Sequence, residues 1–166
     1  MRLMYLLSIA AARRSVRIAT AYFVPDSLTV RALVAARRRG VAVEIIVPGP
    51  HIDFPISRHA SHALWGPLLA AGVKIYEYQP TMYHVKLLIV DDLWVSVGST
   101  NLDYRSFRYN DEANLNVYDA DFARGQNAVL DSDRARSREV TYAQWKRRPH
   151  SEKVRDRLAA LLRWQL

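Results

Sequence analysis

Cysteine is absent from this chain of 166 residues, so disulfides and thiolate metal sites are excluded. The five histidines lack carboxylate partners at the spacings of familiar metal motifs, so we expect no metal centre. No apolar run approaches the roughly 18–20 residues that span a bilayer. Residues 1–15 are amphipathic and end in Arg13 and Arg14, which argues against a cleaved signal peptide. The length and apolar content predict a single domain over residues 1–166 with a sizeable core.

Acidic residues are scarce in the last fifth of the chain. Residues 134–166 hold ten Lys and Arg but three acids, a net charge of +7, whereas residues 1–133 have a net charge of +1. A basic C-terminal helical segment of this kind is typical of proteins that contact an anionic surface, either lipid head groups or nucleic acid. A solvated helical face is the alternative explanation for the same charges.

One stretch, which begins at His84, combines a strand pattern with polar residues at its ends. The segment VKLLIV that follows it alternates its side chains as a strand does, so His84 and Lys86 project from the same face toward one phosphate. Asp91 lies an odd number of positions from His84, which turns it to the other face of an uninterrupted strand. We expect Asp91 to fix the turn at Asp91 and Asp92, where Asp is a favoured turn residue.

A second strand, LWVSV, returns from that turn and ends in Gly98, Ser99, Thr100 and Asn101. A phosphodiester requires a nucleophile or acid, positive charge on its non-bridging oxygens and neutral donors that position it. His84 and Lys86 provide the first two. Ser99 and Asn101 provide the third, so these two residues are candidates for substrate binding.

The remaining chain alternates helices with apolar strands. The β-α-β order predicts parallel pairing with helices packed on the sheet, an α/β/α sandwich with a mixed, mostly parallel central sheet. The first helix is expected to bury Leu3, Leu6, Leu7 and Ala10. The last helix is expected to begin at a Ser151 cap and to carry an apolar stripe. The other expected strands are residues 15–23, 41–47, 73–78 and 112–118, and the other expected helices are residues 27–39, 56–72, 119–137 and 141–149.

The pattern of His84, Lys86 and Asp91, followed by Gly98-Ser99 and Asn101, resembles the H-x-K-x4-D and G-S-x-N signature of the phospholipase D superfamily. Further segments are similar to the second half of bacterial cardiolipin synthases: YFVPD, IIVPG, AGVKIYEYQP, NLDYRSFRYNDE and RSREVT. The resemblance covers nearly the whole chain and implies the phospholipase D-like fold, as one repeat of a normally two-repeat enzyme. It also implies that Glu112 holds the second ring nitrogen of the catalytic His.

Two motifs operate together in that superfamily. One His attacks phosphorus and forms a phosphohistidine, the other protonates the leaving alcohol, and no metal or cofactor is needed. This chain contains one H-x-K, at His84 and Lys86. The resemblance therefore implies a partner: either a separate half with the other motif, or a second copy of this chain in a homodimer.

The resemblance to cardiolipin synthases implies a phosphatidyltransferase that joins two phosphatidylglycerol molecules into cardiolipin and releases glycerol. Its place would be the surface of the bacterial cell membrane, with peripheral attachment. Two alternatives stay open. The chain is a homodimeric phosphodiesterase or nuclease that acts on nucleic acid, or it is an inactive membrane-associated fragment.

Overall fold

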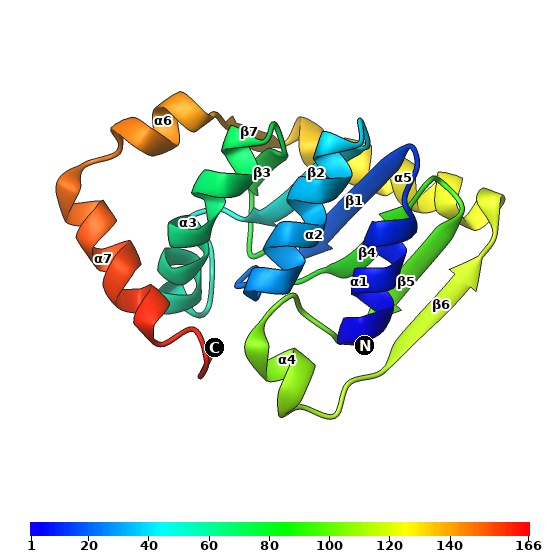
Figure 1. Cartoon of the computed structure of the whole chain (residues 1–166), viewed down its shortest axis with the longest axis horizontal. Helices are drawn as coiled ribbons and strands as arrows, with labels where there is room; N and C mark the ends of the chain where they lie inside the picture. Colours follow the sequence, from blue (N-terminus) through cyan, green and yellow to red (C-terminus); the bar gives the residue numbers. More distant parts are fainter.

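The computed structural model describes residues 1–166 and contains one seven-stranded sheet between helices (Figure 1). The strands run in the order β6-β5-β4-β1-β2-β3-β7. Their bounds are β1 Ser15–Thr20, β2 Ala42–Pro48, β3 Lys74–Tyr78, β4 Lys86–Val90, β5 Trp94–Gly98, β6 Asn114–Tyr118 and β7 Ser137–Val140. The helices are α1 Arg2–Ala11, α2 Ser27–Arg38, α3 Pro55–Ala70, α4 Tyr104–Arg108, α5 Ala120–Ala135, α6 Tyr142–Arg147 and α7 His150–Leu161.

The predicted β-α-β units are confirmed in the centre of the sheet. The strand β1 pairs in parallel with β2, and β2 with β3, through the crossover helices α2 and α3. The sheet is mixed as predicted, but the expectation that it is mostly parallel is wrong. The pairs β1-β4, β4-β5, β5-β6 and β3-β7 are antiparallel. A short turn joins β4 to β5, which only an antiparallel pair allows.

Helices cover both faces of the sheet, which confirms the α/β/α sandwich. The larger core lies between the sheet and the helices α1, α2 and α3, and it contains the fully buried Ile9, Leu33 and Trp65. The smaller core lies on the opposite face, where Ala123 and Leu130 of α5 pack against the strands. Figure 1 shows α5 behind the sheet and α1 and α2 in front of it.

Local signals in the sequence fix several ends of these elements. The side chain of Asp26 accepts a hydrogen bond from the amide of Thr29 and caps α2, and Asp119 caps α5 in the same way. Gly40 follows α2 with a φ of 91°, in the left-handed region that favours glycine after a helix. These caps agree with the boundaries predicted from the sequence.

The buried face of α1 differs from the prediction. Tyr5 and Ile9 are buried, whereas Leu3 and Leu7 are 68% and 60% exposed. The hydroxyl of Tyr5 accepts a hydrogen bond from Nδ2 of Asn114 at 2.8 Å, which ties α1 to β6. The prediction from the leucine spacing is therefore wrong about the face that α1 buries. Tyr5 is buried because it contacts residues from distant parts of the chain, which the helical spacing does not reveal.

The C-terminal segment contains a strand that was not predicted. Residues 137–140 form β7, which pairs with β3; residue 137 was expected to end the preceding helix, and residues 138–140 were not assigned to any element. The last helix, α7, begins at His150 with no side-chain cap, so the predicted Ser151 cap is wrong. This helix packs on α3 with Asp156 and Ala159 buried. None of the helices has the length and apolar character needed to cross a membrane.

Candidate functional site

The imidazole of His84 is exposed, in the loop just before β4. The edge of the Tyr22 ring faces the His84 ring, with ring centroids 5.9 Å apart and an interplanar angle of 87°. The Tyr22 hydroxyl donates to the carboxylate of Asp53, with distances of 2.8 and 2.9 Å to its two oxygens. Burial and the neighbouring Asp53 carboxylate raise the pKa of Tyr22 to about 12, so its hydroxyl stays protonated at neutral pH. The Tyr22 ring, fixed through its hydroxyl, therefore packs beside the accessible imidazole of His84.

The ammonium of Lys86 lies at the same edge of the sheet. Lys86 is the first residue of β4 and pairs with Thr20, the last residue of β1. Its side chain is half-buried, and burial lowers its pKa, while the carboxylates of Glu112, Asp53 and Asp103 act in the opposite direction. The site thus lies outside the carboxyl end of β1, where the strand order reverses, which is the usual position of ligand crevices in open α/β sheets.

The loop after β5 brings Ser99 and Asn101 to this edge. Gly98 is required there, because a Cβ at that position would lie 2.2 Å from the carbonyl oxygen of Ala113. The hydroxyl of Ser99 accepts from the amide of Ala113 at 3.0 Å. Asn101 is 7% exposed, and its side-chain oxygen is buried without a hydrogen-bond partner. Asn101 also lines a small cavity of about 100 Å³ beside Tyr22.

Glu112 is close enough for its charge to influence Lys86, but it makes no hydrogen bond to His84. Its side-chain oxygen instead accepts from Nδ2 of Asn110 at 3.2 Å. The role of Glu112 in orienting a catalytic imidazole therefore stays a prediction.

Asp91 lies at the opposite end of β4 from Lys86, so the structure does not bring it together with His84. Its carboxylate accepts from the backbone amides of Arg13, Arg14 and Ser15 at 2.7–3.1 Å. Burial would raise the pKa of Asp91, but these hydrogen bonds outweigh it and lower the pKa. Asp91 also adopts a left-handed φ of 55° at the β4–β5 turn. The geometry supports the expected turn-fixing role and places no reacting group there.

Two more carboxylates lie near the site, and sequence reasoning did not single out the first of them, Asp53. Asp53 follows β2 in a loop, and its contact with Tyr22 joins segments 31 residues apart. Asp103 was expected to fix its loop through an ion pair with Arg105 or to bind a head group. It instead caps α4 through the amide of Ser106 at 2.7 Å, is 4% exposed, and has a pKa that burial raises. A carboxylate in the loop after a strand is the signal that could have indicated Asp53.

Comparison with known proteins gives the chain a family. Residues 5–134 match the family described as "Cardiolipin synthase, PLD-like domain". Cardiolipin synthase 1 of Staphylococcus aureus (strain COL) is 35% identical over 158 residues, which are 95% of this chain and 32% of the relative. Cardiolipin synthase A of Pectobacterium carotovorum subsp. carotovorum (strain PC1) is 39% identical over 153 residues, 92% of this chain and 31% of the relative. The chain thus spans about a third of the length of these curated relatives.

Solved structures agree with this fold. The phospholipase D family member Nuc from Salmonella typhimurium superposes with a TM-score of 0.74 at 23% identity, over 84% of this chain and 90% of that chain. At this identity the likeness concerns the fold alone. The match over residues 5–134 decides the family: the chain belongs to the phospholipase D-like domain family of cardiolipin synthases.

Proposed function

We propose that this chain is one catalytic half of a cardiolipin synthase-type phosphatidyltransferase, which joins two phosphatidylglycerol molecules and releases glycerol. The observation that carries the proposal is the presence of an exposed imidazole and an ammonium, those of His84 and Lys86, at one sheet edge near Asn101. The family match over most of the chain supports the choice of a phosphatidyl substrate.

The first chemical step is an attack on phosphorus by a ring nitrogen of one of the two motif histidines. With a separate first half, that half supplies the nucleophile and His84 is the acid; in a homodimer, His84 of one copy is the nucleophile and His84 of the other copy is the acid. A P–N bond forms, the bond from phosphorus to the departing glycerol oxygen breaks, and the acid on the opposite side donates a proton to that oxygen. In the second step the hydroxyl of another phosphatidylglycerol gives its proton to the same group, now a base. Its oxygen forms the new P–O bond, and the P–N bond breaks.

The charge of the transition state is spread over the non-bridging oxygens. The Lys86 ammonium opposes that charge, and the Asn101 and Ser99 side chains position the phosphate. The opposing acid needs a second imidazole, since a single His84 cannot attack phosphorus and protonate the leaving oxygen on the opposite side in one step. A second motif, from a separate half or from another copy of the chain, supplies that group, and the two histidines can exchange the roles of nucleophile and acid.

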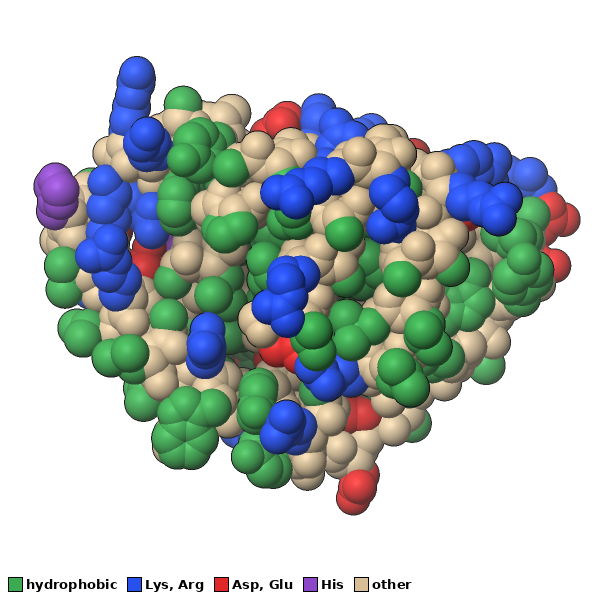
Figure 2. Space-filling model, in the orientation of Figure 1, with side chains coloured by type: hydrophobic (Ala, Val, Ile, Leu, Met, Phe, Trp, Pro, Cys, Tyr) green, Lys and Arg blue, Asp and Glu red, His purple; other side chains and the backbone are tan.

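The C-terminal segment supports attachment to an anionic membrane surface. In α7 and just beyond it, Val154, Leu158, Leu161 and Trp164 are 53–69% exposed. Figure 2 shows apolar side chains gathered over α7 and the C-terminus, next to Lys and Arg. An apolar stripe flanked by basic side chains is typical of helices that lie in the plane of a membrane surface, so we place this half at the bacterial cell membrane.

A second candidate function is a homodimeric phosphodiesterase or nuclease. The single motif, the net charge of +7 in residues 134–166 and the fold likeness over 90% of Nuc favour it. The test offers the chain two substrates, vesicles of phosphatidylglycerol and single-stranded DNA. Each is assayed with the chain alone and with a phospholipase D-like first half added. Cardiolipin and free glycerol in equal amounts support the first proposal, whereas DNA cleavage by the chain alone supports the second. Inactivity on both substrates in both mixtures would leave the membrane-associated fragment.

A further inference from the structure

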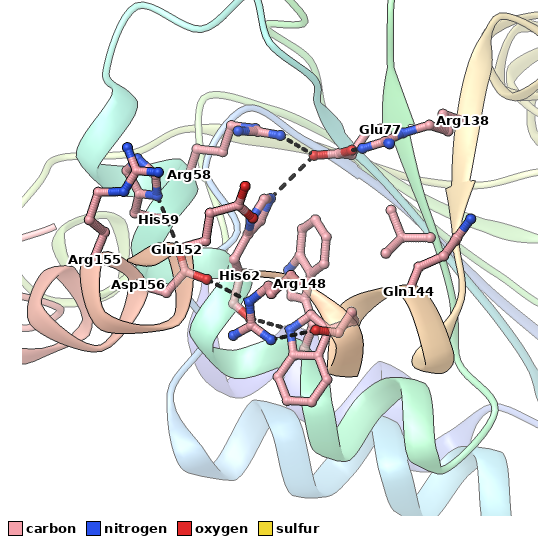
Figure 3. Close-up of a pocket in the computed structure, with 13 residues that line it drawn as sticks. Arg58, His59, His62, Glu77, Arg138, Gln144, Arg148, Glu152, Arg155 and Asp156 are labelled. Atoms are coloured by element: carbon pink, nitrogen blue, oxygen red, sulfur yellow. Dashed lines mark hydrogen bonds and ion pairs between the residues drawn. The ribbon is translucent and has the colours of Figure 1, made fainter. Parts of the chain in front are cut away.

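A second cavity, of about 500 Å³, lies away from the His84 site, between α3, β3 and the C-terminal elements β7, α6 and α7 (Figure 3). Its volume falls in the range of small-ligand sites. Apart from the apolar wall formed by Trp65, Val140 and Trp145, its lining is polar and mostly charged. The start of α3 borders both cavities: Ser57 lines the one beside Tyr22, Arg58 lines this one, and the two linings share no residue.

Positive charge exceeds negative charge around this cavity. Four arginines line it, together with Glu77, Glu152 and Asp156, so its net charge is 4 − 3 = +1 with neutral histidines. The four arginines are Arg58, Arg138, Arg148 and Arg155. A net charge of +1 in the lining is complementary to a ligand that carries one negative charge.

Glu77 is the negative centre of the cavity, and it is already neutralised by more than one cation. Its buried carboxylate accepts from Arg58 at 2.6 Å and from Arg138, and Nε2 of His62 lies 3.2 Å away. Burial raises the pKa of Glu77, but the hydrogen bonds of His62 and Arg138 and the charge of Arg58 outweigh it and lower the pKa to about 2. The single negative charge of Glu77 is therefore paired with the two positive charges of Arg58 and Arg138, so this side of the cavity keeps a net positive charge.

Asp156 forms the second ion cluster, on α7. Its carboxylate accepts from Nε of Arg148 at 2.9 Å and lies 3.0 Å from Nδ1 of His59. His59 and His62 thus each face a carboxylate. Together the two clusters attach α7 and β7 to α3.

One cation of this lining has no partner in the protein. Arg155 is exposed and makes no ion pair. Figure 3 shows Arg155 extending from α7 beside His59. The planar guanidinium group is suited to binding two phosphate oxygens at once. Glu152 and Gln144 also line the cavity. Glu152 can accept a hydrogen bond from a hydroxyl group, whereas the Oε1 of Gln144 already accepts from Thr141, so its amide group can donate to a hydroxyl oxygen.

We propose that this cavity binds a singly charged phosphodiester head group that carries hydroxyls, either on a lipid or as the free head group. Arg155 contacts the phosphate, and Glu152 and Gln144 contact the hydroxyls. The site is separate from the one that holds His84 and Lys86, so the inference does not depend on the proposed catalytic role.

The test measures binding in a Lys86→Ala background, which removes the catalytic phosphate site. The two probes are soluble glycerophosphoglycerol, titrated by calorimetry in a buffer without phosphate, and phosphatidylglycerol vesicles in a sedimentation assay with phosphatidylcholine vesicles as the blank. The test variant is Arg155→Gln. The matched control is Arg157→Gln, two residues along the same helix, exposed and outside the cavity lining.

Loss of one charged contact is expected to weaken binding by roughly tenfold or more in Arg155→Gln, with little change in Arg157→Gln. This difference with the soluble probe identifies the free head group as a ligand, and the difference with vesicles alone identifies the head group in a membrane. Equal affinities of the two variants for both probes, or no binding by the Lys86→Ala parent, would overturn the proposal. Failure of the catalytic proposal would instead appear as inactivity of the wild type, which this assay does not measure.

Discussion

The carboxylate of Asp91 accepts a hydrogen bond from the amide of Ser15 at 2.9 Å and so joins the end of β4 to the start of β1. The same oxygen accepts from the amide of Arg14. The strand that presents Lys86 at one end is thus anchored at its other end. The first prediction concerns this anchor.

Asp91→Asn is expected to lower the free energy of unfolding by about 1–2 kcal/mol, because hydrogen bonds to a charged acceptor become bonds to a neutral one. Asn tolerates the left-handed backbone of residue 91, so the change tests the charge and not the turn. Urea unfolding checks it, with the exposed Asp111→Asn as control. Wild-type stability in Asp91→Asn would contradict the anchoring role. Unchanged stability with complete loss of activity would make Asp91 a direct catalyst.

Glu77 leads to a prediction about pH. Its pKa is about 2 in the folded chain against an ordinary value of 4.5. A lowered folded pKa means that its contribution to stability is complete above pH 4.5 and is lost as the pH falls from there toward 2. The free energy of unfolding should therefore decrease over that range, and the decrease should be smaller in Glu77→Gln. Parallel pH profiles for the two proteins would contradict the assignment.

Gly98→Ala tests the close approach of the β5 end to the next strand. The added Cβ would lie 2.2 Å from a backbone oxygen of Ala113, so the loop with Ser99 and Asn101 must shift. We expect a loss of about 1–3 kcal/mol in stability and weaker phosphate binding at the catalytic site. Gly125→Ala is the control, since nothing lies within 4 Å of its new Cβ and alanine favours the helix by about 0.5–1 kcal/mol. Equal thermal stability of the two variants would contradict this reading of Gly98.

The proposed chemistry predicts that substitution of His84 or Lys86 lowers the reaction rate. His84→Ala should lower phosphatidyl transfer by about 10³-fold or more with an unchanged melting temperature, because the imidazole is exposed. Lys86→Ala should lower the rate by about 10²–10³-fold through loss of one charge at the transition state. The exposed His150→Ala serves as control. Retention of more than a few per cent of the activity in His84→Ala would contradict the assignment.

The placement of His84 and Lys86 at one edge of the sheet was predictable because the two residues are neighbours along the chain, at the start of one strand. Asp91 was expected on the other face of that strand, whereas the structure places it beyond the other end of β4, in the turn to β5. The β-α-β order gave the parallel centre of the sheet in the same way. Each of these inferences uses a local geometric rule that needs no knowledge of distant segments.

The parts that sequence reasoning missed depend on contacts between distant residues. Glu77 meets Arg138 across 61 positions, and Tyr5 meets Asn114 across 109. The first contact accompanies the pairing of β7 with β3, and the second selects the buried face of α1. No local pattern in the sequence reports either partner, because helical spacing and charge runs describe one element at a time.

The central claim is that this chain supplies half of a two-motif phosphatidyltransferase. The most direct measurement is cardiolipin formation from phosphatidylglycerol as the chain is diluted, alone and with a first half that carries the other motif, while light scattering reports the assembly. We predict activity that appears only with the first half, or in a dimer that tightens when phosphate is added, and that disappears with His84→Ala. A monomer that is fully active alone at high dilution would contradict the account.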